Sequence, residues 1–345
     1  MKLKWLFYGA LLFIFSLSGC SEGLQEEQSI SRAVKKGSIL VINEVAQVLN
    51  CIDPDDHTIS QVSYVGNSAN DIEIDGDFAY VLASQNNTIF KIDLKNGGFI
   101  KTLSLIEDYT SLPSPYNQAI DSNNIYISFW ENGKLGIVDK SSFSLKKSVI
   151  LGSSSYPEGV AVDSNYVYVA LTYYNGGSYS DRKVAIVDKN SYQIITNINV
   201  LTNPQSVAMD KNGALWVACT GYYNTNIWLY EKGGLTKIVK VGEIFTANTV
   251  NQDASYYVVK FDGDRIYAID SLYSTTASGL NVYLLDGTKV TNILAGKNLK
   301  GIDFDNNYIY VSEAYGGNSV YIINKNTYSI TTINNTGGGD LALYK

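Results

Sequence analysis

The sequence predicts an all-β protein: a seven-bladed β-propeller of four-stranded antiparallel blades, its ring closed by pairing of the N- and C-terminal strands. An apolar–aromatic–apolar–small segment recurs along the chain, with its aromatic residue at Tyr80, Tyr126, Tyr168, Trp216, Tyr267 and Tyr310. These positions are roughly 40 to 50 residues apart, which is the length of one propeller blade. The 29 glycines and 27 tyrosines, with only 5 prolines, suit many short strands joined by tight turns.

Each repeat opens with a strand that ends in aspartate, at Asp75, Asp121, Asp163, Asp210, Asp262 and Asp305. Turns of Asp, Asn, Gly and Ser follow, and these residues tolerate positive φ, so each first strand is expected to form a hairpin with the aromatic strand. A third strand is expected at residues 89–93, 135–139, 184–188, 227–231, 282–286 and 320–324. A fourth, edge strand comes after another turn, as at residues 194–198, which completes a four-stranded blade.

The two ends of the chain are expected to share one blade. Residues 39–42 match the second strand and residues 49–53 the third, but no first strand precedes them. Residues 340–344 have the first-strand pattern and no partner of their own. Six complete blades and one shared blade make a closed ring over residues 38–345, which leaves no free sheet edge in the ring.

The N-terminus is expected to be a lipoprotein signal peptide over residues 1–19. Two lysines precede an apolar run at residues 5–17, which is shorter than the ~20 residues of a membrane-spanning helix. Leu17-Ser18-Gly19-Cys20 resembles the bacterial lipobox, and the resemblance implies that Cys20 is lipidated and becomes the first mature residue. An ordinary signal peptide with a chance cysteine is the alternative.

Residues 20–37 are expected to be a lipidated, flexible tether, because residues 21–28 are polar, acidic and without periodicity. Acidic residues directly after the cysteine resemble the surface-export signal of Bacteroidetes lipoproteins. That resemblance implies a location at the bacterial outer membrane, on the cell surface.

Composition limits the chemistry that the chain can perform. A net charge of -7 argues against a nucleic-acid partner, and a single histidine with three cysteines leaves little for a transition-metal site. His57 lies in a solvated turn with no nucleophile motif beside it. Cys51 takes a third-strand core position, far around the ring from Cys219, so no disulfide is expected between them. The acidic segments 71–77 and 262–264 are better hairpin turns than calcium loops. We expect a non-enzymatic, monomeric protein with no metal and no cofactor.

Aromatic residues concentrate on one predicted face, made by the loops between second and third strands and between blades. The ligand-binding candidates there are Tyr109, Tyr116, Trp130, Tyr156, Tyr173, Tyr174, Tyr222, Tyr223, Tyr257, Tyr273 and Tyr315, and the same loops also hold Tyr179, Phe245 and Tyr256. Tyrosine offers contact area and a hydroxyl at little entropic cost, although a third to a half of these rings are expected to be structural. The aromatic residues of the second strands are expected to be structural.

Aligning the first strands on their aspartates predicts the mouth of the central channel. Its residues are Asn70, Tyr116, Glu158, Gln205, Tyr257, Lys300 and Gly339. They differ from one another, which suits one asymmetric, neutral polar ligand with apolar faces, such as a glycan or a corrinoid, better than a symmetric ion or a highly charged ligand.

The repeated Tyr-Val steps resemble the seven-bladed propellers of the YVTN type, over roughly residues 38–345, although no copy keeps the full tetrapeptide. The step Val41-Ile42-Asn43-Glu44 resembles the start of surface propeller lipoproteins of Bacteroidetes, some of which bind cobalamin and pass it to an outer-membrane transporter. The resemblance implies capture of a corrinoid such as cobalamin for a transporter. A glycan is the alternative ligand, and a scaffold or adhesion module that docks a protein partner is the alternative function.

Overall fold

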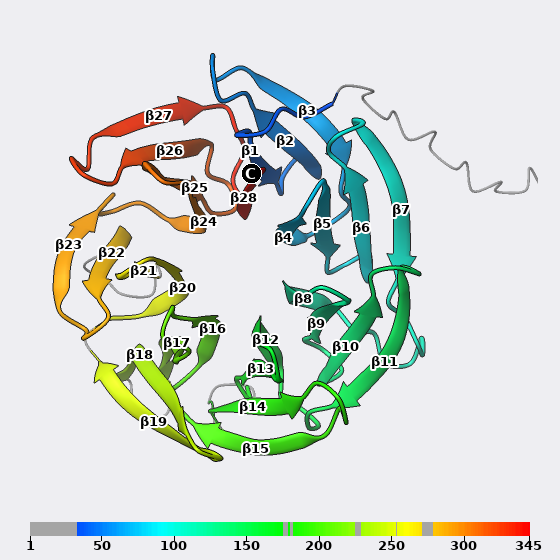
Figure 1. Cartoon of the computed structure of the whole chain (residues 1–345), viewed down its shortest axis with the longest axis vertical. Coiled ribbons are helices and arrows are strands. Elements are labelled where there is room, and N and C mark those ends of the chain that lie inside the picture. The colour runs from blue at the N-terminus through cyan, green and yellow to red at the C-terminus, as the bar shows by residue number, and fades with distance from the viewer. Residues whose placement is uncertain (1–32, 175–178, 180–181, 225–228, 253, 271–278) are drawn as a thin grey trace, which may run out of the picture.

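The computed structural model describes residues 33–174, 179, 182–224, 229–252, 254–270 and 279–345. These residues form strands β1 to β28, arranged as seven four-stranded antiparallel sheets around a common axis (Figure 1). The predicted seven-bladed propeller is therefore confirmed. In this part of the chain, no helix is long and apolar enough to cross a membrane. The signal peptide, Cys20 and most of the predicted tether lie outside the described residues.

Every blade runs from an innermost strand beside the axis to an edge strand at the rim. Blade 1 is β4 (Ala69–Asp75), β5 (Phe78–Ala83), β6 (Thr88–Asp93) and β7 (Gly98–Ser104). Blade 2 is β8 (Pro115–Ile120), β9 (Asn124–Phe129), β10 (Lys134–Asp139) and β11 (Ser144–Ile150). Blade 3 is β12 (Pro157–Val162), β13 (Tyr166–Leu171), β14 (Lys183–Asp188) and β15 (Ile194–Asn199). Blade 4 is β16 (Pro204–Met209), β17 (Leu215–Asn224), β18 (Leu229–Val241) and β19 (Ile244–Asn251). Blade 5 is β20 (Tyr256–Asp262), β21 (Arg265–Asp270), β22 (Gly279–Leu284) and β23 (Lys289–Ile293). Blade 6 is β24 (Leu299–Phe304), β25 (Tyr308–Glu313), β26 (Ser319–Asn324) and β27 (Ile330–Asn334).

Blade 7 closes the ring with strands from both ends of the chain. It consists of β28 (Leu341–Leu343), β1 (Ile39–Asn43), β2 (Val48–Ile52) and β3 (Ile59–Tyr64), in that order from the axis. β28 pairs with β1 in the register Ile39 to Leu343. The predicted closure is confirmed. Before β1, the Val34 amide donates to the Leu94 carbonyl at 2.7 Å, so the folded part of the chain includes residues ahead of position 38.

The core is divided among the interfaces between blades. The buried apolar side chains of the described residues form seven clusters, one between each pair of neighbouring blades. Because the second strands are covered on both sides, their residues are buried on both faces of the sheet instead of alternating between buried and exposed, as in β9, where every residue is buried. The prediction that the second-strand aromatics are structural fits this arrangement, since Trp216, Tyr80 and Tyr126 are among the largest fully buried side chains.

The aspartate after each first strand holds the repeat together. Tyr168 Oη donates to Asp163 Oδ2 at 2.7 Å, and Tyr310 Oη donates to Asp305 Oδ2 at 2.6 Å. In blade 2 the aspartate also takes a lysine from the next blade, as Lys189 Nζ lies 2.7 Å from Asp121 Oδ2. In blades 2, 3, 4 and 6 the aspartate therefore ties its turn to the aromatic strand, which explains why the two motifs recur together there.

Blade 4 departs from the prediction. Residues 227–231 were predicted as its third strand, but β18 continues to Val241 and places Leu235 and Ile238 in the core, while Leu229 is 60% exposed. Tyr222 and Tyr223 were predicted to lie in a loop, but β17 extends to Asn224 and pairs Tyr222 with Glu231. Residues 227–231 form an apolar and aromatic run like that of a third strand. The third strand was therefore predicted several residues too early.

Because the third strand was predicted too early, Phe245 was also assigned to the wrong face. It lies in β19, after the turn between third and fourth strands, and its ring packs 5.6 Å from that of Tyr166 between blades 3 and 4. Tyr256 is also no surface residue, because it is completely buried beside Tyr283.

Candidate functional site

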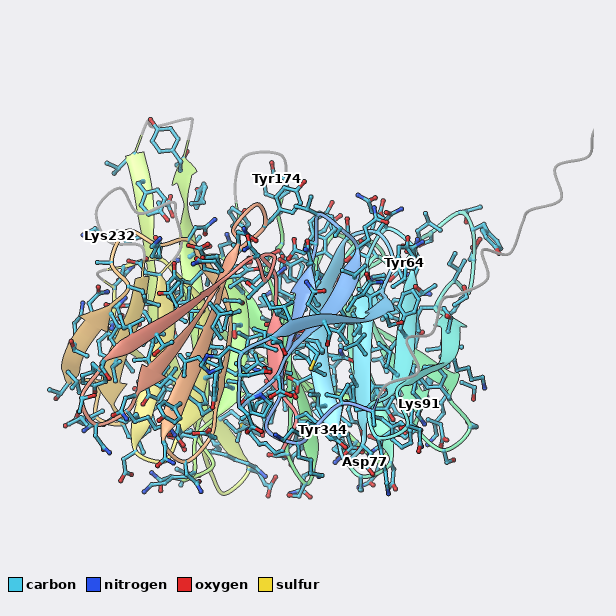
Figure 2. All side chains as sticks on the ribbon, turned by 90° about the horizontal axis from the view of Figure 1, so that it is seen from above. Tyr64, Asp77, Lys91, Tyr174, Lys232 and Tyr344 are labelled. Carbon is cyan, nitrogen blue, oxygen red and sulfur yellow. The ribbon has the colours of Figure 1, made fainter. Side chains whose placement is uncertain are left out.

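The loops between second and third strands and the connections between blades share one face, called here the upper face. Figure 2 shows Tyr174 on this face, with Asp77 and Tyr344 on the opposite, lower face. The hairpin of β17 and β18 rises above the rest of the upper face. His57 lies in the turn between β2 and β3, on the lower face, with a positive φ of 60°.

A cavity of about 280 Å³ lies at the axis of the ring, and its lining includes residues at the upper-face ends of the first strands. Of the predicted mouth residues, five line it: Asn70, Tyr116, Gln205, Tyr257 and Lys300. Glu158 and Gly339 are not among the lining residues, so their prediction as mouth residues is wrong, and the Gly339 amide donates to the Glu313 carbonyl. The lining residues come from the first strands of six blades and from Asp340, directly before β28, so the alignment of first strands located this cavity.

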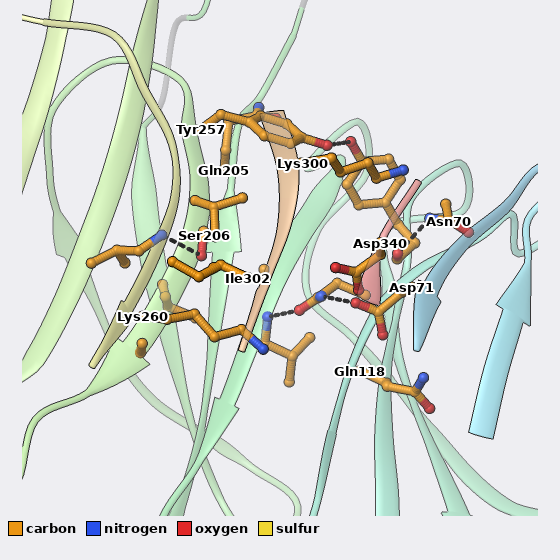
Figure 3. Close-up of a pocket in the computed structure, with 18 of the residues that line it drawn as sticks. Asn70, Asp71, Gln118, Gln205, Ser206, Tyr257, Lys260, Lys300, Ile302 and Asp340 are labelled. Atoms are coloured by element: carbon orange, nitrogen blue, oxygen red, sulfur yellow. Dashed lines mark hydrogen bonds between the residues drawn. The ribbon is translucent and has the colours of Figure 1, made fainter. Parts of the chain in front are cut away.

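Two tyrosines span the cavity near its mouth. Tyr116 of β8 and Tyr257 of β20 come from blades 2 and 5, and their hydroxyl oxygens lie 3.3 Å apart (Figure 3). Burial raises the pKa of both hydroxyls, most strongly that of Tyr116, so both remain neutral donors and acceptors. They can therefore exchange their mutual contact for hydrogen bonds to a polar ligand.

Glu158 lies behind this tyrosine pair and is only 6% exposed. Its Oε1 accepts a hydrogen bond of 2.9 Å from Trp130 Nε1. Burial raises the pKa of Glu158 to about 8, although contacts with Trp130, Tyr116 and Gln205 oppose the shift. The side chain is therefore largely a neutral acid at pH 7.

Five aromatic rings form a chain of contacts across the upper face, called here the aromatic arc: Trp130, Tyr156, Tyr174, Tyr179 and Tyr222. The ring centroids lie 4.7 Å apart for Trp130 and Tyr156, and 6.4 Å apart for Tyr156 and Tyr174. Tyr179 follows at 5.3 Å from Tyr174, and Tyr222 at 5.1 Å from Tyr179. The arc joins blades 2, 3 and 4, and the Trp130–Glu158 hydrogen bond connects it to the channel mouth.

The other predicted aromatic residues have different surroundings. Tyr109 and Tyr223 are 84% and 50% exposed and make no ring contact with the arc among the described residues. Tyr173 packs against the cluster between blades 2 and 3, with Lys183 Nζ 5.5 Å from its ring centroid. Tyr315 lines a neighbouring hollow of about 240 Å³, which shares Asn70 with the channel. Tyr273 lies outside the described residues.

A charged layer below the mouth was missed by the sequence analysis. Asp71, Glu73, Lys260 and Asp340 line the same cavity, and Lys260 Nζ lies 3.6 Å from Glu73 Oε1. The nearby carboxylates, Glu73 first, raise the pKa of Lys260. Burial raises the pKa of Asp71 well above its usual range, and the neighbouring charge of Asp340 adds to this effect.

One signal in the sequence could have revealed this layer. Two residues before the closing position of the first strand, which is aspartate in six blades and Tyr344 in the seventh, four blades carry alanine, at Ala119, Ala161, Ala208 and Ala342. The equivalent residues of the other three blades are charged, namely Glu73, Lys260 and Asp303. A charged residue in a position that is otherwise small and apolar indicates a contact across the channel axis.

In the residues that the structure describes, no group of three or more His, Cys, Asp or Glu side chains is arranged to hold a metal ion. The channel carboxylates instead surround the ammonium group of Lys260, whose pKa is raised by Glu73, Asp340, Asp303 and Asp71.

Comparison with known proteins bears on the fold. No family model and no curated protein matches the chain. Among solved structures, the chain resembles hydrazine synthase of Kuenenia stuttgartiensis, with 14% identity, a TM-score of 0.62, and coverage of 92% of this chain and 99% of that one. It also resembles virginiamycin B lyase of Staphylococcus aureus, with 16% identity, a TM-score of 0.61, and coverage of 81% and 89%. BamB of Moraxella catarrhalis matches with 13% identity, a TM-score of 0.54, and coverage of 90% and 89%.

At these identities the comparisons establish the propeller fold alone. The fold occurs in proteins named as a synthase and a lyase, and also in BamB, whose name states no reaction. Fold does not determine function, so the function has to be argued from the channel mouth and the aromatic arc.

Proposed function

We propose that this protein is a lipid-anchored, non-enzymatic binding protein that captures a small or medium ligand at the mouth of its central channel. The carrying observation is that the aromatic arc leads through Trp130 and Glu158 to a cavity of about 280 Å³. Stacking surface beside a cavity with a few convergent polar groups is the usual composition of a small-molecule site. Cys20 would carry the lipid, placing the propeller at the outer membrane of a bacterium.

The ligand class follows from the size and shape of the site. A cavity of about 280 Å³ is near the lower end of the range of ligand pockets, so it suits one substituent or one sugar ring. A corrinoid such as cobalamin, the ligand suggested by resemblance, would cover the mouth and insert one side group. A glycan would stack a ring on the arc. Delivery of the ligand to an outer-membrane transporter is part of this proposal.

A protein-docking function is the second candidate, and exposed side chains on the upper face favour it. Tyr109, Tyr315 and Leu229 are 84%, 68% and 60% exposed there. A flat patch is typical of a protein interface, whereas a cavity is typical of ligand capture. Because the cavity lies at the centre of the face, we favour ligand capture.

A thermal-shift screen tests the proposal. The protein would be heated with corrinoids, haem and oligosaccharides, because a ligand that binds only the native state raises the melting temperature. We expect one class to do so, and expect Trp130→Phe, which removes the donor to Glu158 Oε1 but keeps a ring, to reduce the effect. If no class raises the melting temperature, small-ligand capture is wrong and protein docking becomes the better explanation.

A further inference from the structure

We infer that the ligand of the channel mouth carries a primary alkylammonium arm, which enters the cavity and binds the carboxylates of Asp71 and Asp340. This inference rests on the proposed function, because it specifies the chemistry of one arm of the ligand captured there. Three features of the cavity lead to it: an excess of carboxylates, buried acceptors without donors, and an apolar wall.

Carboxylates outnumber ammonium groups around the cavity. Lys300 Nζ lies 2.5 Å from Glu44 Oε1, and Lys260 pairs with Glu73. Lys260 and Lys300 are near enough to lower the pKa of Asp340, but among the described residues neither Asp71 nor Asp340 has a lysine within ion-pair distance. Figure 3 shows these two side chains next to one another in the cavity, and the charge of Asp340 contributes to raising the pKa of Asp71. A second cation is therefore the charge that would complete this layer.

The cavity also has hydrogen-bond acceptors that no described residue satisfies. Asp71 is 5% exposed, and its Oδ1 accepts from Asn117 Nδ2 whereas its Oδ2 has no hydrogen-bond partner. Gln118 is 2% exposed, and its Nε2 donates to the Tyr80 carbonyl. Its Oε1 has no hydrogen-bond partner among the described residues. Buried acceptors without donors are costly, so this side of the cavity favours a group that donates several hydrogen bonds. A primary ammonium provides three donors and no acceptor.

The rest of the lining fits the methylene part of such an arm. Val207, Val258 and Ile302 line the cavity together with Tyr116 and Tyr257. A ligand carboxylate or phosphate would face the same surplus of carboxylates and be repelled, and a neutral arm would leave the charge excess unchanged. Burial raises the pKa of both Asp71 and Asp340, and for Asp71 the charges of Asp340 and Glu73 add to the effect, which is consistent with carboxylates that lack a full counter-charge.

The test measures binding of two probes of equal length to the full-length protein. n-Pentylamine hydrochloride and 1-pentanol differ only in the charged end, and sodium chloride at equal ionic strength is the control. We expect pentylamine to bind at least tenfold more tightly than pentanol, by thermal shift and by calorimetry. Equal affinities, or no binding of pentylamine, would overturn the inference, since a shared proton or ordered water would then satisfy the carboxylates.

Two variants assign the contact. Asp71→Asn and Asp340→Asn keep the side-chain shape and remove one charge each, so at least one is expected to fold. Each is expected to weaken pentylamine binding at least tenfold and leave pentanol binding unchanged. Unchanged pentylamine affinity in a folded variant contradicts the assignment. Glu243→Gln, which removes one carboxylate outside both the cavity and the aromatic arc, should leave the amine affinity unaltered. If pentylamine does not bind but a corrinoid, haem or oligosaccharide raises the melting temperature, this inference alone is wrong. If pentylamine binds but none of those ligands raises the melting temperature, the proposed function is wrong.

Discussion

Replacing Glu158 by glutamine should make the protein more stable at alkaline pH. The carboxyl is 6% exposed, and burial raises its pKa from 4.5 to about 8. Glutamine keeps an oxygen that accepts from Trp130 Nε1 and removes the group that has to ionise. The unfolded chain releases the Glu158 proton near pH 4.5, whereas the folded protein holds it until about pH 8.

The sign and size of the effect follow from this difference in proton binding. Between the two pKa values the folded state binds more protons than the unfolded state, so the contribution of Glu158 to stability falls as the pH rises. One pKa unit corresponds to ~1.4 kcal/mol. From pH 5 to pH 8 the free energy of unfolding of the wild type should therefore fall by roughly 4 kcal/mol relative to Glu158→Gln, and it should change little above pH 8.

Urea unfolding of both proteins at pH 5, 7 and 9 measures this difference, because the contributions of all other titrating groups cancel between them. Glu243→Gln is the matched control, since the side chain of Glu243 is 87% exposed. The control should show a difference from wild type that is nearly independent of pH. A constant difference for Glu158→Gln as well would refute the argument that burial keeps this carboxyl neutral.

Three further predictions concern the scaffold and its anchor. Tyr168→Phe removes the hydroxyl that donates to Asp163 and should destabilise the protein by ~1.5–3 kcal/mol, as for other hydrogen bonds to charged groups. Tyr168→Ala should cost ~3–5 kcal/mol, because it also leaves a cavity. Tyr168→Phe melting at the wild-type temperature would contradict the role of the hydroxyl. Truncation after Gly339 removes the buried side chains of Leu341, Leu343 and Tyr344, each worth ~1.5–3 kcal/mol, and exposes the edge of β1, so the melting temperature should fall. A truncated chain that melts at the wild-type temperature would show that β28 is dispensable. Cys20→Ser should abolish lipid incorporation and release the protein from membranes, and retention of labelled fatty acid by that variant would exclude Cys20 as the lipidated residue.

The sequence predicted the scaffold well because each blade repeats a local code. The turn aspartate has to satisfy its own hairpin and the aromatic residue of the next strand, as Asp163 does for Tyr168, and both requirements lie within six residues. The closing strand could be predicted for a different reason, because residues 340–344 have a first-strand pattern with no partner nearby in the chain. Blade 4 failed because residues 227–231 form an apolar and aromatic run that resembles a third strand, although the core part of the strand lies further along, at Leu235 and Ile238. Local pattern alone does not distinguish a buried strand from a projecting one.

The candidate site was only partly predictable. Aligning the first strands located the cavity mouth, because equivalent residues of a ring converge on its axis. The charged layer was missed because Glu73 and Lys260 are 187 positions apart in the sequence and meet only across the channel. The aromatic arc likewise depends on loop conformations of blades 2, 3 and 4, which residue type does not determine. Tyr173 and Tyr174 show this, since the first packs against the core and the second contacts the arc.

The most direct test of ligand capture at the channel mouth is a paired measurement of binding and melting for Tyr174→Ala, with Tyr315→Ala as the control. Tyr174 contacts two rings of the arc and is 39% exposed, whereas Tyr315 is 68% exposed and lies outside the arc. With the ligand found in the screen, Tyr174→Ala should weaken binding by ~1–3 kcal/mol and barely change the melting temperature, and Tyr315→Ala should alter neither. A Tyr174→Ala variant that melts early yet binds with wild-type affinity would mean that the arc is packing, and the proposed site would be wrong.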